Sequence, residues 1–252
     1  MFNDILLFIA VGFAAQMVDG ALGMAYGLTA TTVLLSFGTT PAVASASVHA
    51  AEVFTTAASG AAHWRLGNVD RGLLWRLALP GMAGGIAGAY VLTAFPGDTL
   101  RPIIAVYLLA AGLVVLIRGL RANLPPPIDC HKVNGWFART LGLAGGFLDA
   151  VGGGGWGSLV TTTLIWCGLQ PRIAIGTVNA AEFFVTTVVA TTFLATIGLE
   201  LWPVILGLII GGIIAAPFAA LAAKHMPDRP LMIIVGVLII ILSLRQIVRA
   251  FA

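Results

Sequence analysis

Charged residues are scarce in this chain. They make up 9% of its 252 residues, whereas soluble domains carry about 25%. No Lys or Arg occurs from Met1 to Trp64 or from Ile173 to Ala223. Together with 59% hydrophobic residues and a mean hydropathy of +1.02, this deficit excludes a soluble domain and predicts membrane-spanning helices.

Three further absences narrow the class of protein. The two cysteines, Cys130 and Cys167, are too few for a disulfide framework or a Cys-rich metal site. No ATP-binding motif is present, so ATP-driven transport would need a separate subunit. The first 25 residues lack a basic segment, which makes a cleavable signal peptide the weaker interpretation. We expect neither a metal nor a cofactor.

What the chain does contain is an internal repeat. Residues 19–56 align with residues 149–186 at a constant offset of 130 positions without a gap, and 15 of the 38 aligned positions are identical. Two of the repeated residues are carboxylates within apolar stretches, where charge is expensive. A duplicated membrane unit that keeps acids in both copies is typical of a transporter.

The apolar stretches divide into ten helical segments, five in each repeat. Turn residues such as those at 38–41 and 168–171 separate them. The expected segments are about 3–18, 24–37, 41–64, 72–95 and 100–119, then 136–149, 156–168, 171–195, 201–224 and 230–249. We therefore predict an all-α polytopic membrane protein, with a first membrane repeat at 1–120, a polar Pro-rich linker at 121–134 and a second membrane repeat at 135–252.

The odd number of segments in each repeat predicts that the second repeat is inverted relative to the first. With the amino terminus outside, ten of the 13 Lys and Arg residues fall on the inner side, as the positive-inside rule requires. Arg101, Arg245 and Arg249 fall outside. The count is the same whether the first two segments of each repeat span the membrane or form a re-entrant hairpin, and both alternatives stay open.

Each repeat opens with two segments that are short for a bilayer. Segment 24–37 has 14 residues, or roughly 21 Å at 1.5 Å per residue, against a hydrocarbon core of about 30 Å. Glycine-rich breaks at Asp19–Gly27 and Asp149–Gly157 separate the short segments. Short, glycine-broken segments at matching places in two halves are the best sequence indication of a transporter's binding site.

Glu52 and Glu182 lie near the middle of their helices, so both are expected near the bilayer midplane. Polar residues at helical spacing share the faces of these glutamates: Ser45, His49, Thr56 and Ser59 in the first repeat, and Asn179 and Thr186 in the second. Desolvation favours a protonated carboxyl, so both glutamates are candidates for proton exchange during transport. The structural alternative is a neutral Glu hydrogen-bonded to a neighbouring helix.

The breaks offer further candidate ligands. Asp19 and Asp149 either cap the following short helix or line a cavity, and Tyr26 and Trp156 either pack in the core or contact a ligand. Glycines 152–155 and 157 expose N–H groups beside a helix N-terminus, as an anion cradle does. The candidate substrate-binding residues are Asp19, Gly23, Tyr26, Gly27, His49, Glu52, Thr56, Asp149, Gly153, Gly154, Trp156, Gly157, Ser158, Asn179, Glu182 and Thr186, with Glu52 and Glu182 as candidate proton-coupling residues.

Two enzyme interpretations lack essential partners. His49-Ala-Ala-Glu52 resembles half of a metal site, but the second repeat has Asn179 in place of the His and no second ligand pair follows. Gly157-Ser158 lacks the glycine that a hydrolase motif needs two residues after the serine. We expect no catalytic residues.

At these residues the chain resembles the sulfite exporter TauE/SafE family of membrane transport proteins. The resemblance rests on the D-G-x-x-G-x-x-x-G element at Asp19–Gly27, its counterpart at Asp149–Gly157 and the two Ala-Ala-Glu helices, and it covers nearly the whole chain. It implies a secondary transporter in the inner membrane that exports sulfite, a sulfonate or a related organic anion. Ala21 and Ala25 stand where some copies of the motif have glycine, so the first break is less able to wrap an anion.

Charge alone argues for a different substrate. Four acids and one His in the membrane favour cations, but proton coupling reconciles them with an anion, because a protonated Glu admits the anion and a deprotonated one repels it. The alternatives are a passive anion channel and a proton or metal-cation carrier. The expected partners are a small anion, the lipid bilayer and, as an alternative to a monomer, a second copy of the chain. Nucleic acid is not expected.

Overall fold

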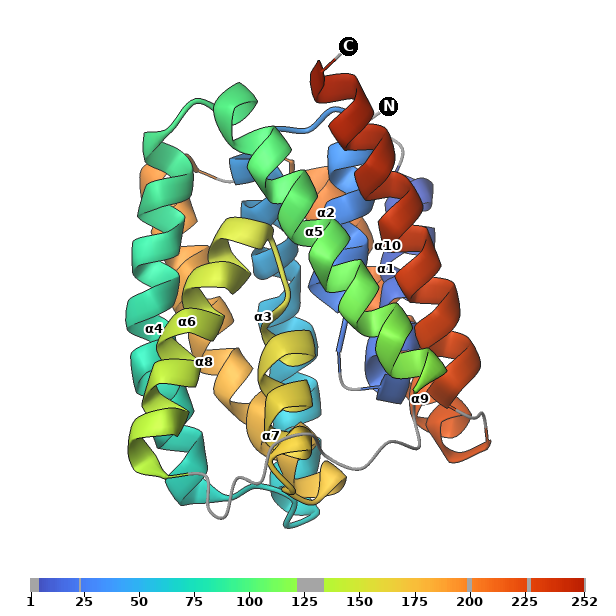
Figure 1. Ribbon diagram of the computed structural model, residues 1–252. Helices are drawn as coiled ribbons and strands as arrows, with labels where there is room; N and C mark the ends of the chain where they lie inside the picture. The colour runs from blue at the N-terminus through green and yellow to red at the C-terminus, as the bar shows by residue number, and fades with distance from the viewer. Residues whose placement is uncertain (1–4, 23, 122–133, 199–200, 226–227, 252) are drawn as a thin grey trace.

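The computed structural model describes residues 5–22, 24–121, 134–198, 201–225 and 228–251, and regular structure within them is helical throughout. Figure 1 shows the arrangement. In chain order the elements are α1 (Ile5–Leu22), α2 (Tyr26–Ser36), α3 (Pro41–Arg65), α4 (Arg71–Ala94), α5 (Gly97–Leu120), α6 (Gly135–Gly152), the π-helical turn η1 (Gly157–Thr161), α7 (Thr162–Trp166), α8 (Pro171–Thr196), α9 (Trp202–His225) and α10 (Asp228–Phe251).

These elements correspond to the ten predicted segments, with η1 and α7 together forming the seventh. The first helix of each repeat runs three or four residues further than predicted. α6 ends only where Gly153 adopts a φ of 70°, a left-handed conformation that terminates a helix. Asp19 therefore lies inside the last turns of α1 instead of after it. The predicted linker falls almost entirely on residues 122–133, which lie outside the described residues.

Four helices form two parallel pairs that join one repeat to the other. α1 packs on α9, and α6 packs on α4. The two contacts are equivalent, because Gly12 lies against Leu208 and Gly142, 130 positions after Gly12, lies against Leu77. A side chain at Gly12 would come within 2.5 Å of the Leu208 carbonyl oxygen. Small residues let the backbones approach closely, as in other membrane helix pairs.

Two further pairs lie on the axis that relates the repeats. α3 packs on its counterpart α8, and α5 packs on its counterpart α10. Thr56 lies beside Thr186 and Gly60 beside Ala180, so α3 and α8 run antiparallel; α5 and α10 also run antiparallel (Figure 1). An axis that exchanges antiparallel helices is perpendicular to them. The repeats thus have the inverted relationship that the odd number of segments predicts.

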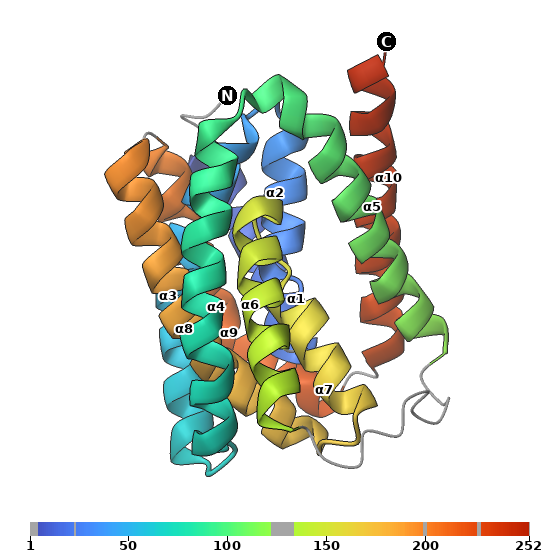
Figure 2. The same cartoon turned by 60° about the vertical axis from the view of Figure 1, so that its left-hand side comes forward.

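The short segments form hairpins that turn back inside the bundle. The outer ends of α1 and α2 lie at the same end of the bundle as both termini (Figure 1). The second hairpin, made of α6, η1 and α7, enters from the opposite end, and the turned view in Figure 2 agrees. The re-entrant alternative is therefore the one observed.

Basic residues gather at the end away from the termini. The α3–α4 turn, the end of α5 and the starts of α6 and α8 all lie there (Figures 1 and 2). These segments carry Arg65, Arg71, Arg121, Arg139 and Arg172. This is the end that the positive-inside rule predicts to face the cytoplasm.

Three helices among the described residues are long and apolar enough to cross a membrane: Arg71–Ala94, Thr99–Leu120 and Arg172–Thr196. Shorter apolar helices cover Ile5–Asp19, Trp202–Ala215 and Met232–Val248. α3 is long, but Ser45, His49 and Glu52 on its buried face lower its hydropathy. These polar residues are turned toward the protein interior, where other helices cover them.

The sidedness is testable with two exposed positions at opposite ends of α4. Phe95 follows α4 and is 54% exposed, and Leu66 precedes α4 and is 72% exposed. In a background with Cys130→Ser and Cys167→Ala, a membrane-impermeant maleimide applied to intact cells should label Phe95→Cys and spare Leu66→Cys until the cells are opened. Labelling of both positions from outside would contradict a membrane-crossing α4, and the reverse pattern would contradict the orientation.

Candidate functional site

The tips of the two hairpins meet at the centre of the bundle. Gly27, on α2, lies against Gly154, in the loop after α6, so that a side chain on Gly27 would come within 2.5 Å of the Gly154 Cα atom. Thr31, one turn further along α2, donates its hydroxyl hydrogen to the Gly153 carbonyl oxygen. Glycine is required at this crossing, because no side chain fits between the two backbones.

Left-handed backbone shapes both breaks. Gly153, Gly154 and Gly155 have φ angles of 70°, 126° and 137°, which residues with a side chain rarely adopt. Ala25, the counterpart of Gly155, has a φ of 85° although it carries a methyl group, a conformation that costs about 1–2 kcal/mol. The first break thus keeps one left-handed position of the second, at Ala25, although it lacks the glycine there.

Asp19 and Asp149 cap the second helix of their hairpins. Asp149 Oδ1 accepts a hydrogen bond of 2.9 Å from the Trp156 amide, and Asp19 Oδ1 accepts one of 3.4 Å from the Tyr26 amide. Each carboxylate therefore satisfies an N–H group that the helix start leaves without a partner. Of the two interpretations of these aspartates, the structure shows the capping contact directly.

The glycine amides of the second break are partly engaged by the same aspartate. The Gly153 and Gly154 amides both donate to the Asp149 main-chain carbonyl oxygen. An anion bound at this break would therefore have to use amides further along, at Gly155 and Gly157. The anion cradle remains a prediction for those two positions.

His49 joins α3 to the second hairpin. Its Nε2 atom lies 3.1 Å from Asp149 Oδ2, and its Nδ1 atom lies 2.8 Å from the Ser45 carbonyl oxygen. Both His49 and Asp149 are at most 1% exposed. A carbonyl oxygen only accepts, so Nδ1 carries a hydrogen, and one further proton is shared between Nε2 and the carboxyl group. Wherever that proton sits, the pair has no net charge.

The second repeat has no such ion pair at the equivalent position. Asn179 replaces His49, and its Nδ2 donates to the Ile175 carbonyl oxygen at 2.9 Å, just as Nδ1 of His49 donates to Ser45. Asn cannot take a proton at physiological pH, so only the first copy of this helix carries a titratable group here. The two halves share a framework and differ in charge.

Glu52 presents an unsatisfied carboxyl oxygen at the hairpin crossing. The residue is 3% exposed. Its Oε1 atom lies against the Gly27 backbone, where an added Cβ would be 2.8 Å away. Its Oε2 atom is buried and has no hydrogen-bond partner among the described residues. Buried polar atoms in proteins are nearly always bonded, so this exception indicates a place for a proton donor or a ligand.

Glu182 faces the same centre from α8. Its charge interacts with those of Glu52, Asp149 and Asp19, so the four membrane acids share one region. The threonines four residues after each glutamate, Thr56 and Thr186, donate to the carbonyl oxygens of Glu52 and Glu182, and their hydroxyl oxygens are 3.5 Å apart. The two acid-bearing helices therefore cross where the repeats meet.

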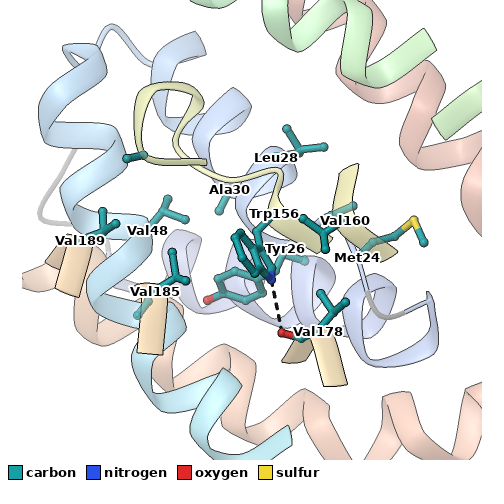
Figure 3. Packing of buried hydrophobic residues seen from close by; sticks show 14 of the residues in the cluster. Met24, Tyr26, Leu28, Ala30, Val48, Trp156, Val160, Val178, Val185 and Val189 are labelled. Atoms are coloured by element: carbon teal, nitrogen blue, oxygen red, sulfur yellow. Dashed lines mark hydrogen bonds between the residues drawn. The ribbon is translucent and has the colours of Figure 1, made fainter. Parts of the chain in front are cut away.

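The aromatic pair of the two breaks is buried. Tyr26 is 2% and Trp156 is 0% exposed, and both belong to the hydrophobic core shown in Figure 3. The Trp156 indole N–H donates to the Val178 carbonyl oxygen at 3.3 Å, and the Tyr26 hydroxyl donates to the Leu208 carbonyl oxygen at 3.1 Å. Their polar atoms are thus already satisfied by backbone, which favours the packing role over ligand contact.

The remaining predicted residues lie at the edge of this region. Gly157 and Ser158 belong to η1, and the Ser158 hydroxyl donates to the Gly155 carbonyl oxygen at 2.9 Å. Ser158 also lines a cavity of about 260 Å³ beside α5. Gly23 lies outside the described residues.

Two candidate functional residues, both on α5, were not predicted from the sequence. Tyr107, on α5, packs on Gly152 and Gly155, where a side chain on either glycine would collide with the tyrosine. Arg118, also on α5, is half-buried and donates to Thr162 Oγ1 at 2.6 Å. Arg118 is one of the ten inner-side cations in the positive-inside count, which takes no account of the helix face. Its spacing from Tyr107, eleven residues or three turns, places the two on one face of α5.

Comparison with known proteins identifies the family of the chain. Residues 8–245 match the family model described as Sulfite exporter TauE/SafE. The chain belongs to this family. A curated relative, the probable membrane transporter protein YtnM of Bacillus subtilis (strain 168), is 43% identical over 250 residues, which are 98% of this chain and 83% of the relative. No solved structure matches the chain.

The TauE/SafE assignment confirms a polytopic membrane transport protein with the helical architecture that the sequence predicts. A transporter is generally not an enzyme. The roles of individual site residues remain predictions.

The His49–Asp149 pair gives a stability prediction. His49→Asn leaves a buried carboxylate without its donor, and removing one partner of a buried ion pair costs about 3–5 kcal/mol. We expect the unfolding temperature of the purified protein to fall by several degrees, and Asp149→Asn added to His49→Asn to restore part of the loss. His63→Asn, on the exposed end of the same helix, is the matched control. Equal unfolding temperatures for His49→Asn and His63→Asn would show that the pair is not formed.

The hairpin crossing gives a second prediction. Gly27→Ala places a methyl group 2.5 Å from Gly154 and 2.8 Å from Glu52 Oε1, so it should separate the tips and lower stability by about 1–3 kcal/mol. Gly97→Ala is the control, since its methyl group would have no neighbour nearer than 3.5 Å. Both variants are compared by thermal unfolding in detergent. An unchanged unfolding temperature for Gly27→Ala would contradict the tip contact.

Proposed function

We propose that the protein is a secondary transporter that exports a small sulfur-containing anion, such as sulfite or a sulfonate, across the inner membrane together with a proton. Family membership supports the anion. One observation supports the proton: the Glu52 carboxyl is buried at the hairpin crossing with its Oε2 atom unpartnered among the described residues. An ionised carboxylate in such a place is costly, so protonation or ligand binding is favoured.

The charges at the centre explain why the proton is needed. His49 balances Asp149 only, so the remaining acids would repel an anion if all were ionised. A proton on Glu52 removes one negative charge and adds an O–H donor, which an oxyanion accepts. Loss of that proton restores the repulsion and expels the anion. Proton and anion then cross in the same direction, and the anion gradient drives export.

The hairpins supply a way to expose the site to one side at a time. They enter from opposite ends and touch at Gly27 and Gly154. While the two tips are in contact, they block access to the centre of the bundle. Displacement of one hairpin-bearing bundle relative to the other opens the centre toward one side, which is alternating access around a fixed site.

A cation carrier is the second candidate, because four acids converge on one centre. Counterflow with purified protein in liposomes tests both this and a passive anion channel. A carrier preloaded with unlabelled sulfite should transiently accumulate labelled sulfite uphill, which a channel cannot do. Uptake of labelled cations without any effect of sulfite would support the cation carrier and contradict the proposal.

Proton coupling predicts a pH profile that depends on the two glutamates. Wild-type sulfonate transport should slow as the pH rises on both sides, by up to about tenfold per pH unit, since a protonated carboxyl is required. Glu52→Gln and the double variant Glu52→Gln/Glu182→Gln should lose this dependence, because Gln stays neutral. A sulfonate is the probe because sulfite itself changes charge in this range.

Asp70→Asn is the control for that experiment. Asp70 lies in the α3–α4 turn and caps α4 by accepting a hydrogen bond of 2.9 Å from the Leu73 amide; Asn preserves this cap. This variant should keep the wild-type profile. Full, pH-dependent transport by the double glutamine variant would contradict proton coupling through Glu52 and Glu182.

A further inference from the structure

A cavity of about 260 Å³ separates α5 from the second hairpin. One wall is a single face of α5, formed by Tyr107, Ala110, Ala111 and Val114. The facing wall comes from α6, η1 and α7. Figure 2 shows α5 standing opposite these elements. The volume suits a small molecule, and the inner end of the cavity reaches the glycine break of the second hairpin through Tyr107.

A basic side chain lies beside one end of the cavity and contacts a residue that lines it. Arg118 follows Val114 by one turn on the same face of α5, and its guanidinium donates to Thr162 Oγ1 at 2.6 Å and contacts Met24 Sδ at 3.4 Å. Thr162 and Ser158 both line the cavity, and they are 3% and 6% exposed, respectively. A guanidinium presents five N–H donors in a planar fork that suits a sulfonate, carboxylate or phosphate.

Most of the remaining lining is apolar. Ala110, Ala111 and Val114 lie on the α5 wall beside Tyr107, and two leucine side chains lie on the facing wall beside Thr163. An inorganic oxyanion would lose its hydration there without replacement. A short alkyl chain would instead gain free energy with every methylene removed from water. The cavity therefore suits a molecule with an anionic head and an apolar body.

The small residues that open this space are not part of the repeated framework. α10 is the counterpart of α5, and its corresponding stretch carries Ile240, Ile241 and Leu242 where α5 carries Ala110 and Ala111. The inverted architecture thus does not require alanine at these positions. Their presence on α5 beside Arg118 points to a ligand.

From these contacts we infer that the cavity binds a monoanion with a short alkyl chain. The chain lies along Ala110 and Ala111, and a sulfonate or carboxylate head is held by Arg118, with Thr162 and Ser158 beside it. This inference rests on the proposed function and deepens it, because it assigns organic anions, rather than inorganic sulfite, to this site. Its position next to Tyr107 places the bound anion beside the hairpin tip.

The length of the ligand's alkyl chain is the critical variable for the test. Binding of methanesulfonate through butanesulfonate to the purified protein is measured by calorimetry, with 1-butanol and butylammonium as uncharged and cationic probes. Affinity should rise about two- to fourfold with each added methylene, and neither butanol nor butylammonium should compete. Equal affinity for all sulfonates, or equal binding of butylammonium, would overturn the inference.

Variants locate the binding to the cavity. Ala110→Leu should remove the gain per methylene, because the larger side chain fills the space that the alkyl chain would occupy. Ala87→Leu adds the same volume in the apolar groove between α4 and α6, and it should keep the gain. Arg118→Gln should weaken all the sulfonates about tenfold, whereas Arg118→Lys, which keeps the charge, should weaken them less. Equal effects of the two Ala→Leu variants would overturn the assignment to this cavity. Unfolding temperatures show that each variant is folded.

Two further measurements are needed. One distinguishes a soluble anion from a lipid as the ligand, and the other tests the proposed transport function independently of the cavity. An anionic phospholipid has the same combination of an anionic head and an apolar body, so native mass spectra are recorded for wild type and for Arg118→Gln. The soluble-anion assignment would be overturned by a lipid that co-purifies with wild type only and that butanesulfonate does not displace. Sulfite counterflow tests the proposed function independently. Counterflow without any dependence of binding on chain length overturns the cavity inference alone, and chain-dependent binding without counterflow supports the cavity while contradicting the transport proposal.

Discussion

The structure depends on hydrogen-bonding polar groups in the membrane interior, where water does not satisfy them. At the second glycine break, Asp149 makes most of these hydrogen bonds. Its carbonyl oxygen accepts from two glycine amides, Oδ1 caps η1 through the Trp156 amide, and Oδ2 binds His49 on α3. One residue thus fixes the end of α6 through its main chain, and the start of the next helix and the neighbouring α3 through its side chain. In a membrane such a break is tolerated only with partners of this kind.

The inverted arrangement follows from the same constraint. A hairpin that ends inside the bundle needs a packing partner for the backbone at its tip. Here that partner is the tip of the other hairpin. The meeting of Gly27 with Gly154 requires that both positions lack a side chain, and the parallel pairs α1–α9 and α4–α6 require glycine for their own contacts. The abundance of glycine in the chain therefore reflects close backbone approach between the repeats.

Much of this could be predicted from the sequence because hydropathy and a constant repeat offset are local or periodic signals. They predicted the ten segments and the inversion; the convergence of Glu52 and Glu182 on a transport site remains a prediction. The partner of Asp149 could not be predicted, since His49 belongs to the other repeat, 100 positions away, and no periodicity relates them. Arg118 entered the sequence analysis only as one of ten inner-side cations, because the positive-inside rule counts charges without regard to the helix face on which they lie.

The differences between the repeats carry more functional information than their likeness. A perfectly symmetric pair of halves would offer the same chemistry from both sides. Here His49 faces Asp149 while Asn179 stands at its counterpart, and α5 carries alanines where α10 carries isoleucines. In the proposed mechanism the shared framework allows alternating access, since both hairpins reach the same centre. Changing individual residues within it places a titratable pair and a ligand-sized space beside the second hairpin, each formed with residues of the first repeat. Under the proposed function, substrate selection and hairpin movement then need not be made by the same residues.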